Sequence, residues 1–542
     1  MNTVNHYIDL PVTGDSVSRS QLLAEIQRRG AFDILVVGGG IHGAIVARLA
    51  AASGFKTLLL EKADFAGATS SRSSKMAHGG LRYLELLDFE QVFEGIKARD
   101  EMFEHLSHLV KPSEFLIPVP KGKLLFKWKL GLGLFLYDLL LKHPEHRHRW
   151  IPRSQLSFPG FHSGRQDLMG CYRYTDGIMS DARIVIENVL AARRAGALCI
   201  NHCEVIGRTR SPDETSTVSF RNSLTGATSE VRARLVINCA GPWCSALAHQ
   251  LGSESSRLKF SRGSHIIFAK PWSGPSLFLP LEGRARYYFV WPHPAGTLVG
   301  TTEREVSELS DDPTPSRDEI EEIFARVERD IPDAGLRREN ACYCFAGIRT
   351  LPLRNRVSHS AVLSRKHVWT HQDGVLSLAG GKYTTAWWTA LEGLREAAQL
   401  LGRALEPATL RHRTDLKELP GSMTDGQLAD ITTKLSPLAD GDRARLITRY
   451  GKRLLQSYWC LVDPDIEKQV ALETEIALDT EQAESLEDLM RRRLELECIP
   501  GHGLHYLPTI RAVFQRLRPD LNFDAQAEAY RERMMRIDAL LR

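Results

Sequence analysis

Residues 33–62 read DILVVGGGIHGAIVARLAAASGFKTLLLEK, and this stretch decides the fold. An apolar strand, a glycine turn, a helix of small residues and a second apolar strand follow one another, which predicts a β-α-β unit. The glycines have the spacing Gly38-x-Gly40-x-x-Gly43. They give a tight turn, let the backbone approach a pyrophosphate, and allow the helix to pack closely on the strand. The N-terminus of the helix then offers N–H groups and partial positive charge to phosphates.

Glu61 ends the second strand, where its carboxylate can accept hydrogen bonds from both hydroxyls of an adenosine ribose. The unit therefore predicts a dinucleotide site, but by itself it leaves NAD and FAD open. The following sequence favours FAD, because the polar stretch ATSSRSSKMAHGGLRYLE at 68–85 stands where an NAD enzyme usually has another helical crossover. Its hydroxyls suit the phosphates and ribityl chain of a flavin cofactor. Its composition alone is equally typical of a solvated loop.

Two later segments strengthen the case for FAD. ARLVINCAGPW at 233–243 predicts a buried strand that breaks at Ala240-Gly241, a second backbone contact to the adenosine. GVLSLAGGKYTTAWWTALEGL at 374–394 predicts a strand, a Gly-Gly turn, and a helix whose first turn carries Lys382 and Thr384. A helix N-terminus and an ammonium stabilise the negative charge that develops on a reduced flavin. Three such segments, far apart in the chain, predict one long cofactor.

The bulk composition is that of a large globular protein. A chain of 542 residues is too long for one hydrophobic core, so two or three structural units are expected. With 43% apolar and 25% charged residues it is neither disordered nor fibrous. The net charge of +4 gives no case for nucleic-acid binding. Nine cysteines show no zinc-site spacing, so no metal is predicted, and those in apolar runs predict reduced thiols in a reducing compartment.

The remaining sequence predicts the location. The N-terminus MNTVNHYIDLPVTGD has no basic end followed by an apolar core, so no signal peptide is expected. Residues 121–149 are apolar with basic flanks, but Lys127, Lys129 and Asp138 make the segment too charged to span a bilayer. It suits an anionic membrane surface. A helix packed on its neighbours explains it equally well. HPEHRHRW at 143–150 is interpreted as a basic surface loop in preference to a metal site.

Periodicity outlines the rest of the chain. We expect an α/β core with a more antiparallel insertion, followed from about residue 420 by a helical domain that contains the charged stretches SLEDLMRRRLELE and AQAEAYRERMMRIDALL. Strands are expected at 198–205, 234–239, 265–269, 286–292, 296–301 and 367–378, and helices at 19–30, 181–195, 317–330 and 384–401.

The chain resembles the FAD-dependent glycerol-3-phosphate dehydrogenases and oxidases. The motifs that carry the resemblance are VVGGGIHGA, TSSRSSKMAHGGLRYLE, YTDGIMSDARIVIEN, VINCAGPW, GSHIIF, GTTE, FAGIRTLP and GGKYTT, in the family's order between residues 31 and 400. The resemblance implies an α/β fold with a glutathione-reductase-type, Rossmann-like FAD-binding domain, a substrate cap built on a mixed or antiparallel sheet, and an all-α C-terminal domain. It also implies oxidation of sn-glycerol 3-phosphate to dihydroxyacetone phosphate, with electrons passing to quinone. The expected place is cytoplasmic, on the inner face of the cytoplasmic membrane, and a homodimer is one option.

The expected domain limits follow from the motifs. They are a leader at 1–30, a discontinuous FAD-binding domain at 31–110, 165–255 and 345–405, a cap domain at 111–164 and 256–344, and a helical domain at 420–542.

The resemblance also assigns residues to the site. By their motifs, Arg82, Tyr83, Arg349 and Lys382 are expected to bind the substrate, and His265, Arg349 and Lys382 to take part in catalysis. Cations suit a phosphate, and a neutral imidazole, from His265 or from His78, can accept the hydroxyl proton. The expected FAD-binding residues are Gly38, Gly40, Gly43, Glu61, Thr69, Ser70, Ser71, Ser74, Lys75, His78, Gly79, Gly80, Gly241, Gly381, Lys382 and Thr384.

One departure from the family leaves the substrate open. Glu303 stands after GTT, where the family usually has Asp, and Arg304 follows it. A longer carboxylate that orients a neighbouring cation would reshape the substrate pocket. Two alternatives are therefore kept: a flavoenzyme of the same fold that oxidises another anionic alcohol or amine, with oxygen as a further acceptor, and a flavin-binding docking module without turnover.

Overall fold

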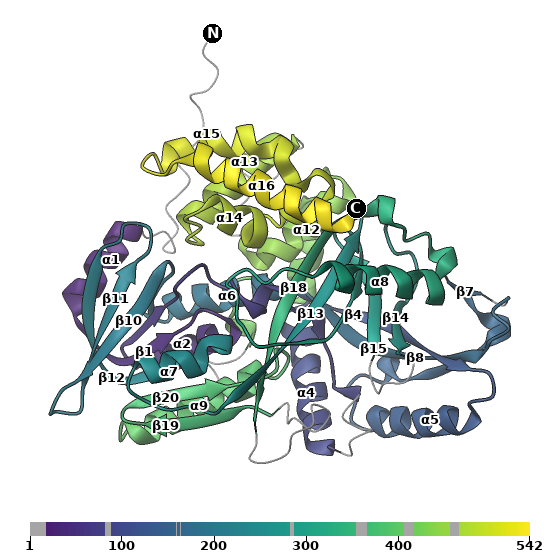
Figure 1. Ribbon diagram of the computed structural model, residues 1–542, viewed down its shortest axis with the longest axis horizontal. Helices are drawn as coiled ribbons and strands as arrows, with labels where there is room; N and C mark the ends of the chain where they lie inside the picture. Colours follow the sequence, from purple (N-terminus) through teal and green to yellow (C-terminus); the bar gives the residue numbers. More distant parts are fainter. Residues whose placement is uncertain are drawn as a thin grey trace, which may run out of the picture.

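The computed structural model describes residues 18–81, 88–158, 160–162, 164–281, 287–353, 366–405, 416–455 and 465–542. Two large sheets form the centre of the structure, and the C-terminal helices form a layer on one side of them (Figure 1). The N-terminal helix α1 (Arg19–Arg29) begins at a Ser18 capping box and ends at Gly30 in the left-handed region.

The predicted β-α-β unit is present. Strand β1 (Ala31–Val37) leads through the glycines into helix α2 (Ile41–Ala52) and on to strand β2 (Thr57–Leu60). Strand β1 pairs in parallel with β2 on one side and with β12 (Thr228–Asn238) on the other. The small side chains of α2 are almost all buried, because the helix packs between α6 (Asp181–Arg194) and α9 (Ala386–Leu400).

The first sheet has eight strands in the order β10-β11-β12-β1-β2-β9, with β20 beside β12 and β19 beyond it. Pairings within β9, β2, β1, β12 and β20 are parallel, so the carboxyl ends of these strands share one edge of the sheet. The predicted strand at 367–378 is in fact an antiparallel hairpin, because Asp373 and Gly374 both take positive φ and turn the chain. The remaining bounds are β9 (Leu198–Ile200), β10 (Cys203–Arg210), β11 (Ser216–Asn222), β19 (Val368–Gln372) and β20 (Val375–Ala379).

The second sheet has ten strands and is antiparallel except where β14 meets β4. Its order is β17-β13-β16-β15-β14-β4-β8-β3, with β18 paired to β13 and β5 paired to β8. This is the antiparallel insertion that the sequence predicts. Its bounds are β3 (Met76–Ala77), β4 (Val110–Pro120), β5 (Arg149–Pro152), β8 (Leu168–Met179), β13 (Leu258–Phe268), β14 (Ser276–Pro280), β15 (Tyr287–His293), β16 (Gly296–Gly300), β17 (Arg304–Val306) and β18 (Ala341–Pro352), and a separate pair is β6 (Ser157–Phe158) with β7 (Phe161–His162).

Helices cover these sheets and form the C-terminal layer, drawn in yellow-green and yellow in Figure 1. The other helices are α4 (Phe89–His105), α5 (Leu124–Asp138), α7 (Cys244–Gln250), α8 (Arg317–Asp330), α11 (Asp425–Lys434), α12 (Asp440–Tyr450), α13 (Ile466–Asp479), α14 (Leu486–Asp488), α15 (Leu507–Leu517) and α16 (Phe523–Leu541). Short 3-10 turns are η1 (Thr69–Ser71), η2 (Pro144–His146), η3 (Arg153–Gln155), η4 (Gly241–Trp243), η5 (Pro332–Ala334), η6 (Arg338–Asn340), η7 (Leu416–Glu418), η8 (Gly451–Leu455), η11 (Leu496–Cys498) and η12 (Pro500–Tyr506).

One predicted helix is wrong. SLEDLMRRRLELE was expected to be a long charged helix, but it forms the three-residue α14 and then the π-helix η10 (Leu489–Arg493). Glu495 takes φ +52° and ends the turn. The three arginines of this stretch are buried and pair with carboxylates instead of facing solvent, as described below. Helix α16 is as predicted.

Helix α5 occupies the basic and apolar segment. Among the described residues, seven of the ten exposed large apolar side chains lie on α5 or next to its end: Leu124, Leu125, Trp128, Leu132, Phe135, Leu136 and Leu139. Lys127 stacks over Trp150, while His148 pairs with Asp138. No helix in the described ranges is both long and apolar enough to cross a bilayer. The eight described cysteines are free, as predicted, and Cys460 lies outside the described residues.

Candidate active site

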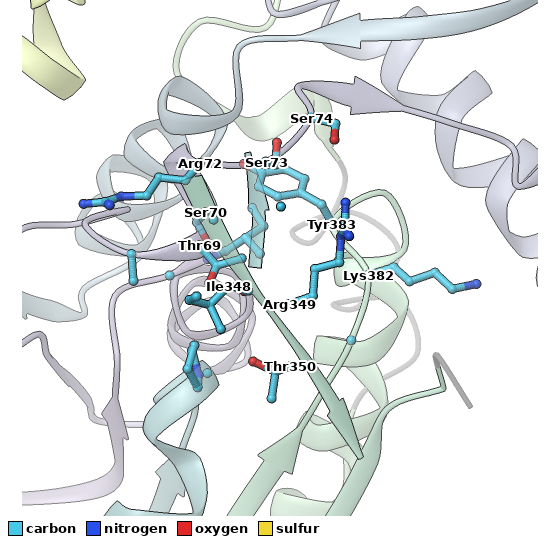
Figure 2. A pocket seen from close by; sticks show the side chains of 18 of the residues that line it. Thr69, Ser70, Arg72, Ser73, Ser74, Ile348, Arg349, Thr350, Lys382 and Tyr383 are labelled. Atoms are coloured by element: carbon cyan, nitrogen blue, oxygen red, sulfur yellow. Dashed lines mark hydrogen bonds between the residues drawn. The ribbon is translucent and has the colours of Figure 1, made fainter. Parts of the chain in front are cut away.

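A cavity of about 550 Å³ runs between the two sheets. At one end it is lined by the glycine turn, Glu61 and Trp243, and at the other by His265 and Arg349. Figure 2 shows the polar loop from Thr69 to Ser74 facing this space together with Ile348, Arg349 and Thr350 of β18. The segments that the sequence predicts to touch one cofactor are therefore brought together along one cavity.

The glycine turn leaves no room for side chains. A Cβ on Gly38 would lie 2.5 Å from the carbonyl oxygen of Cys239, and Gly38 takes φ +109°. A Cβ on Gly43 would lie 1.9 Å from the carbonyl oxygen of Gly38. Gly40 is the N-cap of α2 and lines the cavity. The bare backbone and the helix N-terminus thus face the cavity, as a pyrophosphate requires.

Glu61 is held in place by two backbone donors. Its Oε2 accepts from the N–H of Gly39 at 2.6 Å, and its Oε1 accepts from the N–H of Ala63 at 2.9 Å. Burial raises the pKa of the Glu61 carboxyl, and the two hydrogen bonds act in the opposite direction. Each oxygen has a second lone pair, so the carboxylate is placed to accept from ribose hydroxyls at the adenosine end of the cavity.

Hydroxyls of the 68–80 loop tie it to several parts of the cavity. Ser70 Oγ accepts from the N–H of Ile41 in the first turn of α2 at 2.9 Å. Thr69 donates to the carbonyl of Ile348 at 2.8 Å. Ser74 Oγ and His265 Nε2 lie 3.0 Å apart. The loop thus bridges the glycine turn and the second sheet, with His78 and Gly80 also on the cavity wall.

Four of the predicted cofactor residues do not line the cavity: Gly43, which allows the close approach of α2 to the turn, and Ser71, Lys75 and Gly79. Lys75 takes φ +50°, and its ammonium pairs with the buried Asp181 at 2.6 Å. Ser71 and Lys75 border a second, smaller cavity of about 40 Å³. The N–H of Gly79 donates to Asp176 at 2.9 Å. Ser71, Lys75 and Gly79 therefore hold the loop on the side that faces away from the cavity.

Gly241, Gly381 and Thr384 also line the cavity. Gly381 has φ +106°, and a Cβ there would lie 2.6 Å from the ring of His42. Burial lowers the pKa of His42 to about 3, so its imidazole is neutral, and its Nε2 is buried without a hydrogen-bond partner among the described residues. Thr384 Oγ1 accepts from the N–H of His78 at 3.3 Å. An unpaired polar atom in the wall fits a site built for a polar cofactor.

His265 and Arg349 form the substrate end. His265 lies in β13, is 2% exposed, and stacks on Phe345 with ring centroids 4.8 Å apart. Burial lowers the pKa of His265 to about 3, and the charge of Arg349 acts in the same direction. Arg349 lies in β18, where its guanidinium donates to Thr301 Oγ1 at 3.2 Å. A neutral imidazole therefore stands beside a cation on one wall.

Lys382 departs from its predicted position. Helix α9 begins only at Ala386, after a Thr385 N-cap, so Lys382 precedes the helix and is not in its first turn. Lys382 lines the cavity, but Figure 2 shows its side chain extending away from Arg349. Burial raises the pKa of the Glu94 carboxyl on α4, and the charge of Lys382 acts in the opposite direction, which locates the ammonium toward that helix. Arg82 and Tyr83 lie outside the described residues.

Sequence reasoning missed two buried carboxylates behind the loop. Asp181, at the start of α6, accepts from the hydroxyl of Ser73 at 2.7 Å and pairs with Lys75. Asp176 pairs with the buried Arg99 at 2.9 Å and accepts from Tyr137 at 3.0 Å. Both lie in YTDGIMSDARIVIEN, but an acidic residue in a motif gives no sign of which loop it supports. His42 could have been found, since it stands between the second and third glycines of the turn.

The residues fit FAD. The cavity has a glycine cradle and helix N-terminus for the pyrophosphate, the Glu61 carboxylate for the ribose, and an unpaired His42 nitrogen in the wall. Among the described residues no cluster of His, Cys, Asp or Glu is arranged to hold a metal ion.

Comparisons with known proteins agree with this fit. Residues 33–411 match the family model described as FAD dependent oxidoreductase. The chain is 35% identical over 364 residues to the D-erythritol 1-phosphate dehydrogenase of Brucella abortus, covering 65% of this chain and 71% of that one. It is 31% identical over 518 residues to a glycerol-3-phosphate dehydrogenase of Synechocystis sp., covering 88% and 90% of the two chains. The crystal structure of the glycerol-3-phosphate dehydrogenase from Bacillus halodurans complexed with FAD superposes with a TM-score of 0.75 at 21% identity, covering 96% of this chain and 97% of that one.

Proposed function

The chain belongs to the FAD-dependent oxidoreductases, in the family of the FAD-dependent glycerol-3-phosphate dehydrogenases, and from this premise we propose that it oxidises a secondary hydroxyl of a phosphorylated polyol. The leading candidate is sn-glycerol 3-phosphate, with dihydroxyacetone phosphate as the product. Membership of this family makes the chain an enzyme, so the alternative of a docking module without turnover is dropped.

The observation that carries the proposal is that His265 and Arg349 lie together at one end of the cofactor cavity. The two side chains come from neighbouring antiparallel strands, in which Ser261 pairs with Arg349 and His265 pairs with Phe345. Gly263 lies between them, and a Cβ on it would lie 3.0 Å from the Arg349 guanidinium. The glycine therefore lets the cation lie across β13, close to the imidazole.

Each group has a role in the proposed reaction. Arg349 binds the phosphate, since a guanidinium can make two parallel hydrogen bonds to it. Bound FAD would supply the electron acceptor, with its N5 taking the hydride from the carbinol carbon. His265 takes the hydroxyl proton at Nε2, which now shares a hydrogen bond with Ser74. Arg82, Tyr83 and Lys382 stay predicted substrate contacts.

A tetritol phosphate is the second candidate substrate. It is favoured by the 35% identity with a D-erythritol 1-phosphate dehydrogenase, which exceeds the 31% identity with the Synechocystis protein. Glu303, the departure from the family pattern, lines the cavity next to Arg304, and Arg304 pairs with Glu322. The Glu303 and Glu322 carboxylates could accept hydrogen bonds from an additional hydroxyl of a longer polyol.

Steady-state kinetics with matched substrates test the proposal. Glycerol 3-phosphate, a tetritol 1-phosphate and unphosphorylated glycerol are compared with a quinone analogue and with oxygen as acceptors. We expect kcat/KM for the better phosphate ester to exceed that for glycerol by about 10⁴-fold, because glycerol has no phosphate group to pair with Arg349. Arg349→Met should remove most of this preference. Equal kcat/KM values for glycerol and both phosphates would contradict the proposal.

Helix α5 supports the proposal of peripheral attachment to a membrane, and the cytoplasmic side stays a prediction from the sequence. Its exposed face carries Trp128 and Phe135, 69% and 53% exposed, and Lys121, Lys123 and Lys129 are exposed around it. An apolar face with a basic rim binds anionic lipid surfaces. A membrane-borne quinone is accordingly the proposed acceptor. The homodimer stays a prediction from the sequence alone.

A further inference from the structure

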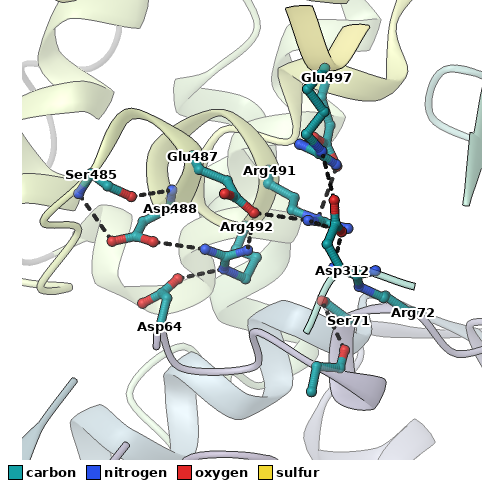
Figure 3. Close-up of polar contacts among 12 residues, drawn as sticks. Asp64, Ser71, Arg72, Asp312, Ser485, Glu487, Asp488, Arg491, Arg492 and Glu497 are labelled. Atoms are coloured by element: carbon teal, nitrogen blue, oxygen red, sulfur yellow. Dashed lines mark hydrogen bonds and ion pairs between the residues drawn. The ribbon is translucent and has the colours of Figure 1, made fainter. Parts of the chain in front are cut away.

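Three consecutive arginines, Arg491, Arg492 and Arg493, are buried at the end of the π-helix η10. Their side chains are only 6%, 4% and 0% exposed. Arginine is almost never buried to this degree unless it is paired. Figure 3 shows where two of them lead: Arg492 reaches Asp64, and Arg491 reaches Asp312. Both carboxylates belong to segments beside the cofactor cavity and not to the C-terminal domain.

Asp64 receives two of the three guanidinium groups. Arg492 Nε lies 2.5 Å from Asp64 Oδ2, and Arg493 donates to both carboxylate oxygens at 2.8 and 2.9 Å. Asn201 donates to Oδ1 as well, at 3.0 Å. Asp64 is 1% exposed. Its position is therefore determined by side chains from the C-terminal domain more than by its own loop.

The loop that Asp64 anchors forms the adenosine end of the cavity. Glu61, whose carboxylate faces the ribose position, is three residues before Asp64. Ala66, two residues after it, donates its N–H to the carbonyl of Gly39 at 3.0 Å. The ring of Phe65 packs on Gly39 so closely that a Cβ there would lie 2.7 Å from it. A shift of Asp64 would consequently move both the ribose acceptor and the glycine turn.

Arg491 is connected to the 69–75 loop through the carboxylate of Asp312. It pairs with Asp312 at 3.1 Å, and Asp312 pairs with the buried Arg72 at 2.5 Å. Arg72 also donates to the carbonyl of Pro313 at 3.0 Å. Arg533 of α16 is a third partner of Asp312, at 3.3 Å. The segment around Asp312 thus fastens the Thr69–Ser74 loop to the C-terminal helices.

A second contact fastens this segment to the adenosine end. Lys62, next to Glu61, pairs with Asp311 at 2.5 Å. Lys62 and Asp311 both line the cavity. Residues 311–313 therefore connect the 61–67 loop with the 69–75 loop across the cavity. Arg491 in turn holds residues 311–313 in place.

We propose that Arg491, Arg492 and Arg493 are positioning residues of the FAD site, which hold the 61–67 loop and the 69–75 loop in the geometry that binds the cofactor. Burying so many charges is a poor way to gain stability, because the desolvation cost offsets much of the attraction. Two of their partners, Asp64 and Asp312, in contrast lie within a few residues of atoms that line the cofactor cavity. The others, Glu481, Glu487, Asp488 and Glu497, belong to the C-terminal region itself. The C-terminal domain is then part of the cofactor site. This holds whichever polyol phosphate is the substrate.

The test uses variants that leave no carboxylate unpaired. Arg492→Met leaves Asp64 with Arg493, and Arg491→Met leaves Asp312 with Arg72 and Arg533. We expect each to raise the Kd of the apoprotein for FAD by about tenfold, measured by the quenching of flavin fluorescence. Arg492→Lys should recover part of the affinity, because an ammonium can still pair with Asp64.

Arg453→Met is the matched control. Arg453 is 1% exposed and pairs with Glu481 at 2.9 Å, and Glu481 keeps Arg183 as a partner at 2.7 Å. The Arg453→Met substitution removes an equally buried guanidinium of the C-terminal domain. Arg453 touches neither the 61–67 loop nor the 69–75 loop. The substitution should lower the melting temperature without changing the Kd for FAD. The proposal is overturned if Arg491→Met and Arg492→Met lower the melting temperature but leave the Kd for FAD as unchanged as Arg453→Met does.

Hydrogen exchange on the unmodified protein gives a test that needs no variant. If the arginines and the loops are coupled, binding is reciprocal, and FAD should stabilise the arginine segment as it stabilises the loops. We expect added FAD to slow amide exchange in 61–75 and also in 489–493. Slower exchange in 61–75 with no change in 489–493 would contradict the proposal.

Discussion

At the scale of single residues, His265 provides a neutral imidazole that can accept a proton. Its imidazole is buried between Phe345 and Ser74 and stays neutral because its pKa is lowered to about 3. His265→Gln should therefore lower kcat by about 10²–10⁴-fold, since the hydroxyl proton loses its acceptor. The measurement is kcat at saturating substrate for variants with equal flavin content. A variant that keeps the kcat of the unmodified enzyme would exclude His265 as the base.

His108 gives a second prediction at this scale. Burial, reinforced by Arg183 and Arg453, lowers the pKa of His108 to about 3, and neither ring nitrogen has a hydrogen-bond partner among the described residues. Below pH 6.5 the unfolded chain binds a proton at this site that the folded chain does not, so the free energy of unfolding falls as the pH falls from 6.5 toward 3. His108→Leu should remove about 2 kcal/mol of this loss between pH 8 and pH 5.

Unfolding by urea at several pH values measures this effect. The free energies of unfolding of the variant and of the unmodified protein should converge, or cross, as the pH is lowered. Parallel curves would show that His108 does not titrate differently in the two states.

Individual site residues could be predicted where a motif fixes the backbone. Gly38, Gly43 and Glu61 lie where the β-α-β pattern locates them, because strand, turn and helix determine their surroundings. Lys75 and Lys382 lie in the predicted segments but point elsewhere, one to Asp181 and the other away from Arg349. The direction of a long side chain depends on partners more than 100 residues away, as Asp181 is from Lys75. Local sequence contains no signal for such a partner.

At the scale of elements, the glycine turn and α2 depend on the absence of side chains. Gly43→Ala would set a Cβ 1.9 Å from the carbonyl oxygen of Gly38, so strand and helix must separate. We expect this substitution to cost about 1–3 kcal/mol of stability and to weaken FAD binding at least about tenfold. Gly207→Ala in β10 is the control, because no atom lies within 4 Å of its added Cβ. FAD affinity equal in the two variants would contradict the role of the turn.

Helix α5 leads to a prediction about membranes. Trp128 and Leu132 are 69% and 62% exposed, so Trp128→Glu with Leu132→Glu should leave the fold intact. Binding to vesicles that contain anionic lipid should fall by about tenfold or more, because two apolar contacts are lost. Sedimentation with vesicles measures this. Met535→Glu, at an equally exposed position on α16, is the control, and equal binding by all three proteins would exclude α5 as the contact.

Elements were predictable where periodicity is strong. Helices α1, α6, α8 and α16 lie where the patterns of apolar residues locate them. The structure of residues 485–498 was not predictable, because a run of charged residues is typical of the solvent-exposed face of a helix. In the structure Arg491, Arg492 and Arg493 have carboxylate partners on loops that are distant in the sequence, and the local pattern contains no signal for them.

At the scale of the whole molecule, distant segments of the chain build one cavity. The glycine turn contributes at residues 38–43, the polar loop at 68–80, β13 at His265, β18 at Arg349 and the Gly-Gly turn at 380–381. The sequence predicts these segments and their shared cofactor, and the family comparison identifies it as FAD. The sequence does not predict the contribution of the C-terminal helices, which hold Asp64 and Asp312. The domain limits stay a prediction.

The central claim is that this FAD enzyme oxidises a polyol phosphate. The most direct test is anaerobic titration of the purified flavoprotein with glycerol 3-phosphate and, separately, with a tetritol 1-phosphate, read at the visible absorbance band of the flavin. The account predicts that one of them bleaches the band at about one equivalent and that the matching ketose phosphate is formed. If the band is unchanged by both phosphates while dithionite still bleaches it, the claim is contradicted.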